Sequence, residues 1–390
     1  MIPQPADRKY RVTVIQANIK RYREPFYLQL RDRLSRNGIG LTVIYSDPGR
    51  IEDSKKDNVD LPSRFAKKAP RICLLNDRIV MQLLPPGAVI RSDLVIIDQA
   101  TGFLHNYPLL LLSRLRLKKV AFWGHGYNRQ GDPASLSERI KKRLVKWSGY
   151  WFAYTQGTAR YLVSIGVPPD KITAVDNAID TKGFRDLLES VEPGEIFEKR
   201  RELGIGEGDR VGLYCGSLYR EKKIPYLINA AKHIGAIEPR FHLLVVGSGI
   251  EADVVRRAGE ANPRIHFTGP LFGRDKAICF RMAEIFLHPG AMGLGILDSF
   301  AAGLPSVTGS EARHGPEIDY LENGVNGLMV SGNEEVFAKA VVDLMRDPAR
   351  MASMRQGAGD SAARYTVENM VEKMSRGILA CLESKNLPDR

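Results

Sequence analysis

The chain has 390 residues, of which 44% are hydrophobic and 26% charged, a composition typical of a soluble globular protein with about two domains. Its four cysteines are far apart and form no C-x-x-C pair, which argues against a disulfide scaffold or a zinc site and favours a reducing compartment. There is no apolar signal core at the start, and no apolar run reaches the ~18–20 residues that span a bilayer. We therefore expect a cytoplasmic protein, either free or at the inner face of the membrane.

The net charge of +12 is concentrated in the first half of the chain. Residues 1–180 contain 30 Lys and Arg against 16 Asp and Glu, whereas the rest contains 27 against 29. A basic half is typical of a domain that meets an anion, and nucleic acid, anionic lipid and a phosphorylated acceptor all fit this charge. Aromatic residues do not alternate with the basic runs as single-strand binding requires, so we do not expect nucleic acid as the partner.

Short apolar segments alternate with helical patterns from the first strand onward, which predicts parallel β-α units. In the first half, strands are expected at residues 11–16, 41–45, 93–98, 119–123 and 150–154. Helices are expected between them at residues 24–37, 104–116, 134–148 and 156–165. The polar, turn-rich stretch 176–193 is expected to be the linker between two domains.

The same alternation restarts after this stretch. Strands are expected at residues 210–215, 241–247, 264–267, 285–288 and 305–308. Helices are expected at residues 225–234, 250–259, 274–283, 293–302 and 334–345. We predict an α/β fold of two Rossmann-like, doubly wound domains that face each other across a cleft. The first covers residues 1–178, with the helix of residues 367–390 packing back onto it, and the second covers residues 179–366.

The helix expected over residues 136–147 has two different faces. Apolar residues, including Trp147, follow one face, and Lys and Arg lie mostly on the other. Such a helix can lie on an anionic membrane, and it is also what a helix that covers a sheet looks like. Both interpretations remain open.

Three basic residues, Lys20, Arg21 and Arg23, follow the first expected strand. A dinucleotide-binding domain would carry G-x-G-x-x-G at this place, so its absence argues against a dinucleotide cofactor in this domain. The three side chains are candidates for binding an anionic acceptor or donor phosphates. The alternative is ordinary surface charge.

A glycine-flanked histidine, His125, follows the strand expected at 119–123, with Asn128 three residues later. Because glycines expose the neighbouring backbone and ring, we take His125 as a candidate catalytic contact to the transferred sugar and Asn128 as an acceptor contact. The alternative is a buried histidine that satisfies one local hydrogen bond.

The loop after the first strand of the second half combines glycine with positive charge. Gly216 and Ser217 lie at the strand end, and Arg220 and Lys222 follow within reach of a diphosphate. The alternative is a solvated charged loop.

Two weaker segments are expected at the same sheet edge. Gly247 begins a tight G-S-G turn after a strand, which can approach a nucleotide, although a lone G-x-G is weak evidence. The segment 314–318 precedes a helix and either lines the cleft or caps that helix.

The stretch 290–303 runs from a strand end through glycines into a helix. The free amides at Gly293, Leu294, Gly295 and Ile296 and the helix dipole favour a phosphate or sugar. Asp298, about one turn inside, is a candidate for holding ribose hydroxyls. The alternative is a glycine-eased turn in which Asp298 only stabilises the start of the helix.

With these motifs in place, the second half resembles the retaining glycosyltransferases of family four, which have the GT-B fold. The likeness is carried by five segments in order: residues 216–222, 243–249, 267–270, 301–305 and 323–327. The first half is similar only in outline, at residues 124–126 and 175–180.

This resemblance implies a nucleotide-diphosphate sugar donor held mainly by the second domain, an acceptor held mainly by the first, retention of configuration and no metal ion. Lys222 matches the family's lysine, whereas Ser217 replaces the usual arginine, for which Arg220 is a substitute. Of the family's two glutamates, the second corresponds to Asp298 and the first, which contacts the donor sugar, to Gly290.

We therefore expect a retaining hexosyltransferase that uses a UDP- or GDP-linked sugar and no other cofactor. The expected acceptor is lipid-linked or a saccharide, in the synthesis of lipopolysaccharide, capsular polysaccharide or exopolysaccharide. When the bond between sugar and phosphate breaks, we expect Lys222, Arg220 and the amides of residues 293–295 to stabilise the negative charge of the leaving diphosphate. The competing interpretations are a catalytically degenerate nucleotide-sugar-binding protein, suggested by Gly290 and Ser217, and a sugar-nucleotide epimerase.

Overall fold

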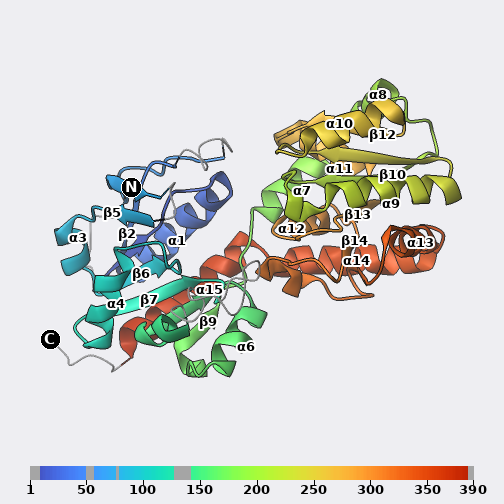
Figure 1. The fold of residues 1–390 in the computed structure, drawn as a ribbon. Helices are drawn as coiled ribbons and strands as arrows, with labels where there is room; N and C mark the ends of the chain where they lie inside the picture. Colours follow the sequence, from blue (N-terminus) through green and yellow to red (C-terminus); the bar gives the residue numbers. More distant parts are fainter. Residues whose placement is uncertain (1–8, 50–56, 76–78, 127–141, 385–390) are drawn as a thin grey trace. The chain divides into compact units, whose positions relative to one another are not determined.

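The protein folds into two compact units (Figure 1). The computed structural model describes four stretches of the chain: residues 9–49, 57–75, 79–126 and 142–384. The first unit contains residues 1–179 together with 367–390, and the second contains residues 180–366. Each unit has its own parallel sheet with helices around it, which confirms the predicted α/β class with two doubly wound domains.

The first unit is built on a parallel sheet with the strand order β3-β2-β1-β6-β7-β8-β9, and β4 and β5 form a separate antiparallel hairpin. Its strands are β1 (Tyr10–Ile15), β2 (Ile39–Tyr45), β3 (Ala66–Lys68), β4 (Arg71–Leu74), β5 (Ile79–Gln82), β6 (Leu94–Asp98), β7 (Lys119–Gly124), β8 (Tyr150–Ala153) and β9 (Ile172–Ala174). The central strands are buried on both faces, as in any parallel sheet covered by helices, which is why they appear as continuous apolar runs in the sequence.

The helices of the first unit connect these strands. They are α1 (Glu24–Arg36), α3 (Pro86–Ile90), α4 (Asn106–Arg114), α6 (Gln156–Ser164) and α15 (Val367–Glu383), with the 3-10 turns η1 (Arg21–Arg23), η2 (Val145–Trp147) and η3 (Pro169–Lys171). The helix expected over residues 134–148 lies mostly outside the described residues, and its described end is η2.

The last helix, α15, belongs to the first unit although it follows the second in the sequence. It contacts α1, where Arg33 and Glu372 form an ion pair. Lys119, at the start of β7, donates its Nζ to the carbonyl oxygens of Leu382 (2.5 Å) and Ser384 (2.9 Å). A cation at this place also complements the negative end of the helix dipole, so α15 is held at both its flank and its end.

The second unit contains a parallel sheet with the order β12-β11-β10-β13-β14-β15. Its strands are β10 (Arg210–Cys215), β11 (Phe241–Val246), β12 (Ile265–Gly269), β13 (Ile285–Leu287), β14 (Ser306–Gly309) and β15 (Gly327–Val330). Its helices are α7 (Thr181–Glu189), α8 (Pro193–Glu202), α9 (Ile224–Ile237), α10 (Ala252–Ala261), α11 (Gly273–Met282), α12 (Gly295–Ala301), α13 (Glu334–Met345) and α14 (Pro348–Arg364), with the 3-10 turns η4 (Arg220–Lys222) and η5 (Pro316–Tyr320).

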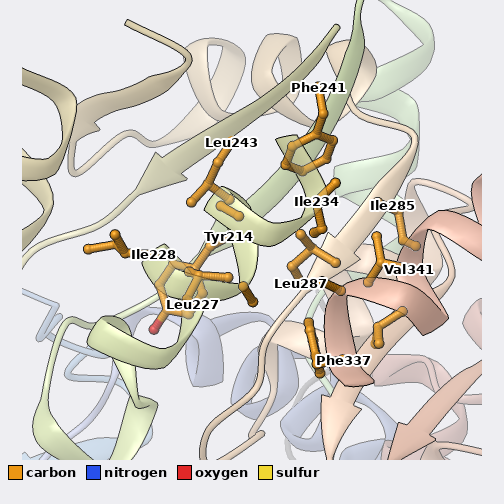
Figure 2. Close-up of a cluster of buried hydrophobic side chains, with 14 of the residues drawn as sticks. Tyr214, Leu227, Ile228, Ile234, Phe241, Leu243, Ile285, Leu287, Phe337 and Val341 are labelled. Atoms are coloured by element: carbon orange, nitrogen blue, oxygen red, sulfur yellow. The ribbon is translucent and has the colours of Figure 1, made fainter. Parts of the chain in front are cut away.

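Figure 2 shows one buried core of the second unit, where α9 and α13 pack on the sheet. The side chains come from both helices and three strands: Tyr214, Leu227, Ile228, Ile234, Phe241, Leu243, Ile285, Leu287, Phe337 and Val341. All of them are at most 5% exposed. This core anchors β10, β11 and β13, whose carboxyl ends carry the predicted donor-binding loops.

The boundary between the two units lies within the linker expected at residues 176–193, but half of this stretch is the helix α7 and not a loop. Asp180 caps this helix by accepting a hydrogen bond from the amide of Gly183 at 2.9 Å. Thr181 and Leu188 are buried on its inner face. The polar composition therefore belongs to the exposed face of a helix, and the two units divide just before its cap.

Two glycines of α14 give a matched test of how closely this helix packs against the loop at Val325. A Cβ at Gly357 would lie 2.3 Å from the carbonyl oxygen of Val325, whereas no atom of the described residues would come within 4 Å of a Cβ at Gly359. We expect Gly357→Ala to lower the free energy of unfolding by about 1–3 kcal/mol, because backbone must move. Gly359→Ala should raise it by up to about 1 kcal/mol, because alanine favours helix. Denaturant unfolding of both variants checks this, and equal stabilisation by both would contradict the close contact.

Candidate active site

The loops that follow β10 and β11 touch each other at the carboxyl edge of the second sheet. The amide of Leu218 donates to the carbonyl oxygen of Ser248 at 2.8 Å. A Cβ at Gly247, where φ is +156°, would lie 1.8 Å from the carbonyl oxygen of Gly216. The backbones of the predicted donor residues Gly216 and Gly247 are thus in direct contact, and this contact leaves no room for a side chain at Gly247.

Lys222 extends from the turn η4 to the loop that follows β13. Its Nζ donates to the carbonyl oxygen of Ala291, and the amide of Ala291 donates to the carbonyl oxygen of Glu221 at 2.8 Å. Burial lowers the pKa of Lys222, and the carboxylates of Glu317 and Glu221 act in the opposite direction. The predicted phosphate partner is thus a partly buried cation, whereas Arg220 in the same turn is exposed.

The segment around Met292 is fixed from its other side by His314. The amide of Met292 donates to Nδ1 of His314 at 3.1 Å, and Nε2 of His314 donates to the carbonyl oxygen of Gly309 at 2.8 Å. The amide of Gly315 donates to the carbonyl oxygen of Met292 at 2.8 Å. Since Nδ1 accepts and Nε2 donates, the ring is a neutral tautomer that cross-links two loops of the site.

Gly290 lies where backbone crowding excludes any side chain. A Cβ there would lie 2.3 Å from the carbonyl carbon of Lys222, 2.4 Å from its oxygen and 2.5 Å from the oxygen of Glu221. The first glutamate of the family pattern therefore has no room in this protein, because the loop of Lys222 occupies its space.

Asp298 projects from α12 and forms an ion pair with Lys276 of α11, with Nζ and Oδ2 2.8 Å apart. The ammonium of Lys276 also lies 4.6 Å from the ring centroid of Phe184. Burial opposes the charge of Lys276, but the carboxylate of Asp298 and its hydrogen bond leave the pKa of Lys276 raised. The carboxylate proposed for ribose is thus already oriented by a cation that the sequence analysis did not select.

The remaining donor candidates lie around the start of α12. Gly293, Leu294 and Gly295 are partly exposed, whereas the side chain of Ile296 is buried and its amide donates to the carbonyl oxygen of Gly293 at 3.2 Å. Ser217 is partly exposed, and its carbonyl oxygen accepts from the hydroxyl of Tyr214 at 2.7 Å. The amides of Gly293, Leu294 and Gly295 can therefore face a ligand, whereas the amide of Ile296 is used in the first turn of the helix.

His288 lies buried beneath this edge, at the end of β13. Its ring stacks on those of Tyr214 (5.0 Å between centroids) and Phe286 (6.0 Å). Burial, with the nearby charge of Lys222, lowers the pKa of His288 to about 3. The ring is therefore neutral at physiological pH and acts as a flat support for the site.

In the first unit, Arg23 is buried among aromatic rings at the end of the sheet. Its guanidinium carbon lies 4.6 Å from the centroid of Trp123 and 5.4 Å from that of Tyr154, and Nη1 donates to Sδ of Met370. Only 4% of Arg23 is exposed. It is not ordinary surface charge, and its contacts fix the loop in place through cation–π interactions.

Asp98, at the end of β6, is a second buried charge that the sequence analysis missed. Its carboxylate accepts from Nε2 of Gln16 at 2.5 Å and from the amide of Ala17 at 3.3 Å. Burial raises the pKa of Asp98 to about 6, although these hydrogen bonds and the charge of Arg23 oppose the shift. A carboxyl group tuned toward neutral pH at a strand end is a candidate for proton exchange.

His125 is exposed next to an anchored glycine. The side chain of Gln99 donates Nε2 to the carbonyl oxygen of Gly126 at 2.7 Å and accepts from its amide at 2.8 Å. The ring of His125 lies 4.3 Å from that of Tyr154. The ring of His125 is exposed, which argues against the alternative of a buried structural histidine.

The other acceptor candidates differ in placement. Lys20 forms an ion pair with Asp57 at 2.8 Å, and Arg21 is exposed beside it. Asn128 lies outside the described residues. The structure therefore places Arg23 and His125 against the same ring, that of Tyr154, with Lys20 and Arg21 directly before Arg23 in the chain.

Lys276, Asp98 and Gln99 were missed because each resembles an ordinary residue of its element. Asp98 ends the apolar strand β6 and Gln99 follows it, which was a usable signal, since ligands bind at the carboxyl ends of parallel strands. Lys276 gave no signal, because its partner is 22 residues away on another helix. Within the described ranges, no cluster of His, Cys, Asp or Glu can hold a metal ion, and no helix is long and apolar enough to cross a membrane.

Family models match both units of the chain. The model of glycosyltransferase family 4 matches residues 24–182, and that of glycosyl transferases group 1 matches residues 209–347. The chain is similar to the solved structure of the Anabaena protein HepE in complex with UDP, with a TM-score of 0.68 at 17% identity over 95% of this chain and 99% of that one. Both comparisons agree with the two-unit architecture.

Curated relatives are more similar to this chain in sequence than the solved structure is. The D-inositol 3-phosphate glycosyltransferase of Stackebrandtia nassauensis is 27% identical over 357 residues, which are 84% of this chain and 74% of that protein. The GDP-mannose-dependent monoacylated alpha-(1-6)-phosphatidylinositol monomannoside mannosyltransferase of Corynebacterium glutamicum is 28% identical over 51% of this chain and 54% of that protein. Among several further relatives, the chain spans only about half of their length.

Restoring the family's glutamate gives a test of the crowding at Gly290. We expect Gly290→Glu to lower the free energy of unfolding by at least about 1–3 kcal/mol, because the Lys222 backbone must move. Gly293→Ala is the control, since a Cβ there meets nothing within 4 Å. Thermal unfolding without ligand measures both, and a Gly290→Glu protein as stable as the control would contradict the crowding.

The buried ring of His288 gives a pH test. Its folded-state pKa, about 3, is below its unfolded value of about 6.5, so the folded state binds fewer protons between these values. Stability should therefore fall as the pH drops below about 6.5. We expect His288→Phe to reduce the loss of unfolding free energy between pH 7.5 and pH 5 by about 2 kcal/mol. Urea unfolding at both pH values measures this, and an unchanged loss would rule out the buried neutral ring.

Proposed function

The chain belongs to the glycosyltransferases of family 4, with the GT-B fold, and on this premise we propose that it transfers a hexose from a UDP- or GDP-linked donor with retention of configuration. The acceptor is lipid-linked or a saccharide, and no metal ion or other cofactor takes part. The reaction serves the synthesis of bacterial envelope polysaccharide or glycolipid, including lipopolysaccharide and capsular polysaccharide. The enzyme works in the cytoplasm at the inner face of the membrane.

One observation carries this proposal: Lys222 places its ammonium against the backbone at the glycine-lined edge of the second sheet. The partners that it has in the structure are a carbonyl oxygen and nearby carboxylates. A diphosphate oxygen that replaces the carbonyl oxygen brings a negative charge to the hydrogen bond from the ammonium, which makes the bond stronger. The exposed Arg220 and the amides of Gly293 to Gly295 supply further donors around the same place.

The chemistry follows from the charge that develops when the donor breaks. The bond between the anomeric carbon and the phosphate oxygen breaks, and the diphosphate leaves with the bonding electrons. Lys222, Arg220 and the amides stabilise this negative charge. The acceptor hydroxyl then bonds to the same face of the sugar, and its proton passes to the leaving phosphate oxygen. Asp298, oriented by Lys276, holds the ribose, and His125 is the candidate for a contact to the transferred sugar.

An anionic acceptor agrees with the basic first half of the chain. Lys20, Arg21 and Arg23 follow β1, and His125 follows β7 at the same edge of the sheet. The names of two relatives point in the same direction, since one refers to D-inositol 3-phosphate and the other to a phosphatidylinositol mannoside. We therefore favour an acceptor that carries a phosphate, such as a lipid-linked saccharide.

The second candidate is a catalytically silent protein that binds nucleotide sugars. It is favoured by Gly290, where backbone fills the space of the glutamate that contacts the donor sugar in the family. Donor turnover distinguishes the two. A sugar-nucleotide epimerase, the third interpretation, would release an altered sugar without any acceptor.

Nucleotide binding is the first test. In thermal unfolding without added metal, UDP or GDP at ~100 times its dissociation constant should stabilise the protein by about 2.7 kcal/mol. Lys222→Ala should remove this shift, because the diphosphate loses its buried cation. Lys232→Ala, an exposed lysine of α9, is the matched control and should keep it.

Sugar transfer is then measured with a labelled donor and a bacterial lipid extract. Label in the lipid phase supports the transferase. Nucleotide binding without transfer or release of sugar would favour the silent binding protein, and no binding of any nucleoside diphosphate would overturn the donor site.

A further inference from the structure

The end of α4 forms a turn that presents two leucines and two arginines to solvent. Leu115 is 57% exposed and Leu117 is 61% exposed, and Arg114 and Arg116 are exposed between and beside them. Single exposed leucines are common on protein surfaces. Here, however, apolar and basic side chains alternate over four residues at one projecting end, which is a pattern that calls for an explanation.

The turn is held by its own backbone. The amide of Leu117 donates to the carbonyl oxygen of Leu112, and the amide of Arg116 donates to that of Ser113, each at 2.9 Å. These two bonds form a Schellman motif, in which the αL position is normally glycine. Here it is Arg116, with φ +58°. The turn therefore holds an arginine side chain at a position where glycine would be less strained.

A buried lysine attaches a second exposed segment to the base of this turn. Lys118 is 9% exposed, and its Nζ donates to the carbonyl oxygens of Ile90 (2.9 Å) and Ser92 (2.6 Å) at the end of α3. Ile90 is 64% exposed, and Arg91 is exposed next to it. Leu111, on the last turn of α4, is 49% exposed. Figure 1 shows α3 and α4 on the same side of the first unit.

We propose that this surface docks the protein on an anionic phospholipid membrane. We call it the Leu-Arg tip, and it consists of Ile90, Arg91, Leu111, Arg114, Leu115, Arg116 and Leu117. The apolar side chains enter the boundary between headgroups and acyl chains, while the arginines extend their charge to the phosphates. The tip is distinct from the helix expected over residues 136–147.

The chemistry of the tip fits lipid better than another macromolecule. It has no aromatic side chain on which a nucleic-acid base can stack. It also consists of only seven residues, whereas a stable protein interface buries about 800 Å² on each partner, from about 20–30 residues. Arginines interspersed with leucines match a surface that is negative at its headgroups and apolar just below them.

The proposal rests on the proposed function in one respect, because a lipid-linked acceptor makes membrane docking useful. Docking would hold the first unit, which carries the acceptor candidates, at the surface where such an acceptor resides. Vesicle binding itself needs neither donor nor acceptor, so it can be tested independently of sugar transfer.

The test is co-sedimentation of the full chain with vesicles of phosphatidylcholine, with and without phosphatidylglycerol. We expect binding only with phosphatidylglycerol, weaker at high salt. Arg114→Gln/Arg116→Asn should weaken it about 25-fold, at about fivefold for each arginine. Asparagine tolerates the αL conformation, so the turn is kept. Leu115→Ser/Leu117→Ser should weaken it by about tenfold or more.

Ile250→Ser/Phe272→Ser is the matched control, since these residues of the second unit are 80% and 71% exposed. It should bind vesicles like the unaltered protein. Equal binding by the tip variants and the control would overturn the proposal. A dimer in light scattering that the leucine variant dissociates, without vesicle binding, would assign the tip to a second copy instead.

Nucleotide binding of the tip variants separates this proposal from the proposed function. Retained nucleotide stabilisation with vesicle binding that does not depend on the tip refutes the docking surface alone. Tip-dependent vesicle binding without any nucleotide binding supports the docking surface and refutes the proposed transferase.

Discussion

Close contact between backbone segments at the carboxyl edge of the second sheet determines most of what the candidate donor site can be. At Gly247 and Gly290, a Cβ would lie 1.8 Å and 2.3 Å from another segment's backbone. These contacts bring the loop of Lys222 onto the segment after β13, where Ala291 exchanges hydrogen bonds with it. The glycines are therefore required by packing, and the same packing removes the acid that the family pattern would place at Gly290.

Two charged groups of this edge, Lys222 and Asp298, already have partners before any ligand arrives. Lys222 donates to a carbonyl oxygen, and Asp298 is held by Lys276. Paired groups of this kind are oriented in advance, so a ligand spends less free energy on ordering them. The partner that Lys222 gives up is a neutral carbonyl oxygen, which is weaker than a phosphate oxygen. Lys222 can thus exchange the carbonyl oxygen of Ala291 for a phosphate oxygen, with which it forms a stronger hydrogen bond.

The sequence was sufficient to predict most strands and helices, but it was insufficient to predict contacts between residues that are far apart in the chain. The strand expected at 210–215 and the helix at 334–345 are observed with those bounds as β10 and α13, because their apolar periodicity reflects burial in one core. The helix α7 was not foreseen, since its capping residue Asp180 also fits a turn. Among the site residues, Lys222 could be predicted from the sequence, because it lies in the loop that follows a strand. Lys276 and the cross-link through His314 depend on tertiary contacts that no local pattern encodes.

The placement of α15 has a consequence for the order in which the protein folds during synthesis. The second unit is continuous in sequence, over residues 180–366, whereas the first needs residues 367–383 to cover α1 and to pair Lys119. Domains usually mature in the order in which the ribosome produces them. Here the unit that is translated first is completed last, and its surface beneath α15 stays open until the other unit has emerged. During that interval the nascent chain exposes apolar residues that the finished protein buries under α15.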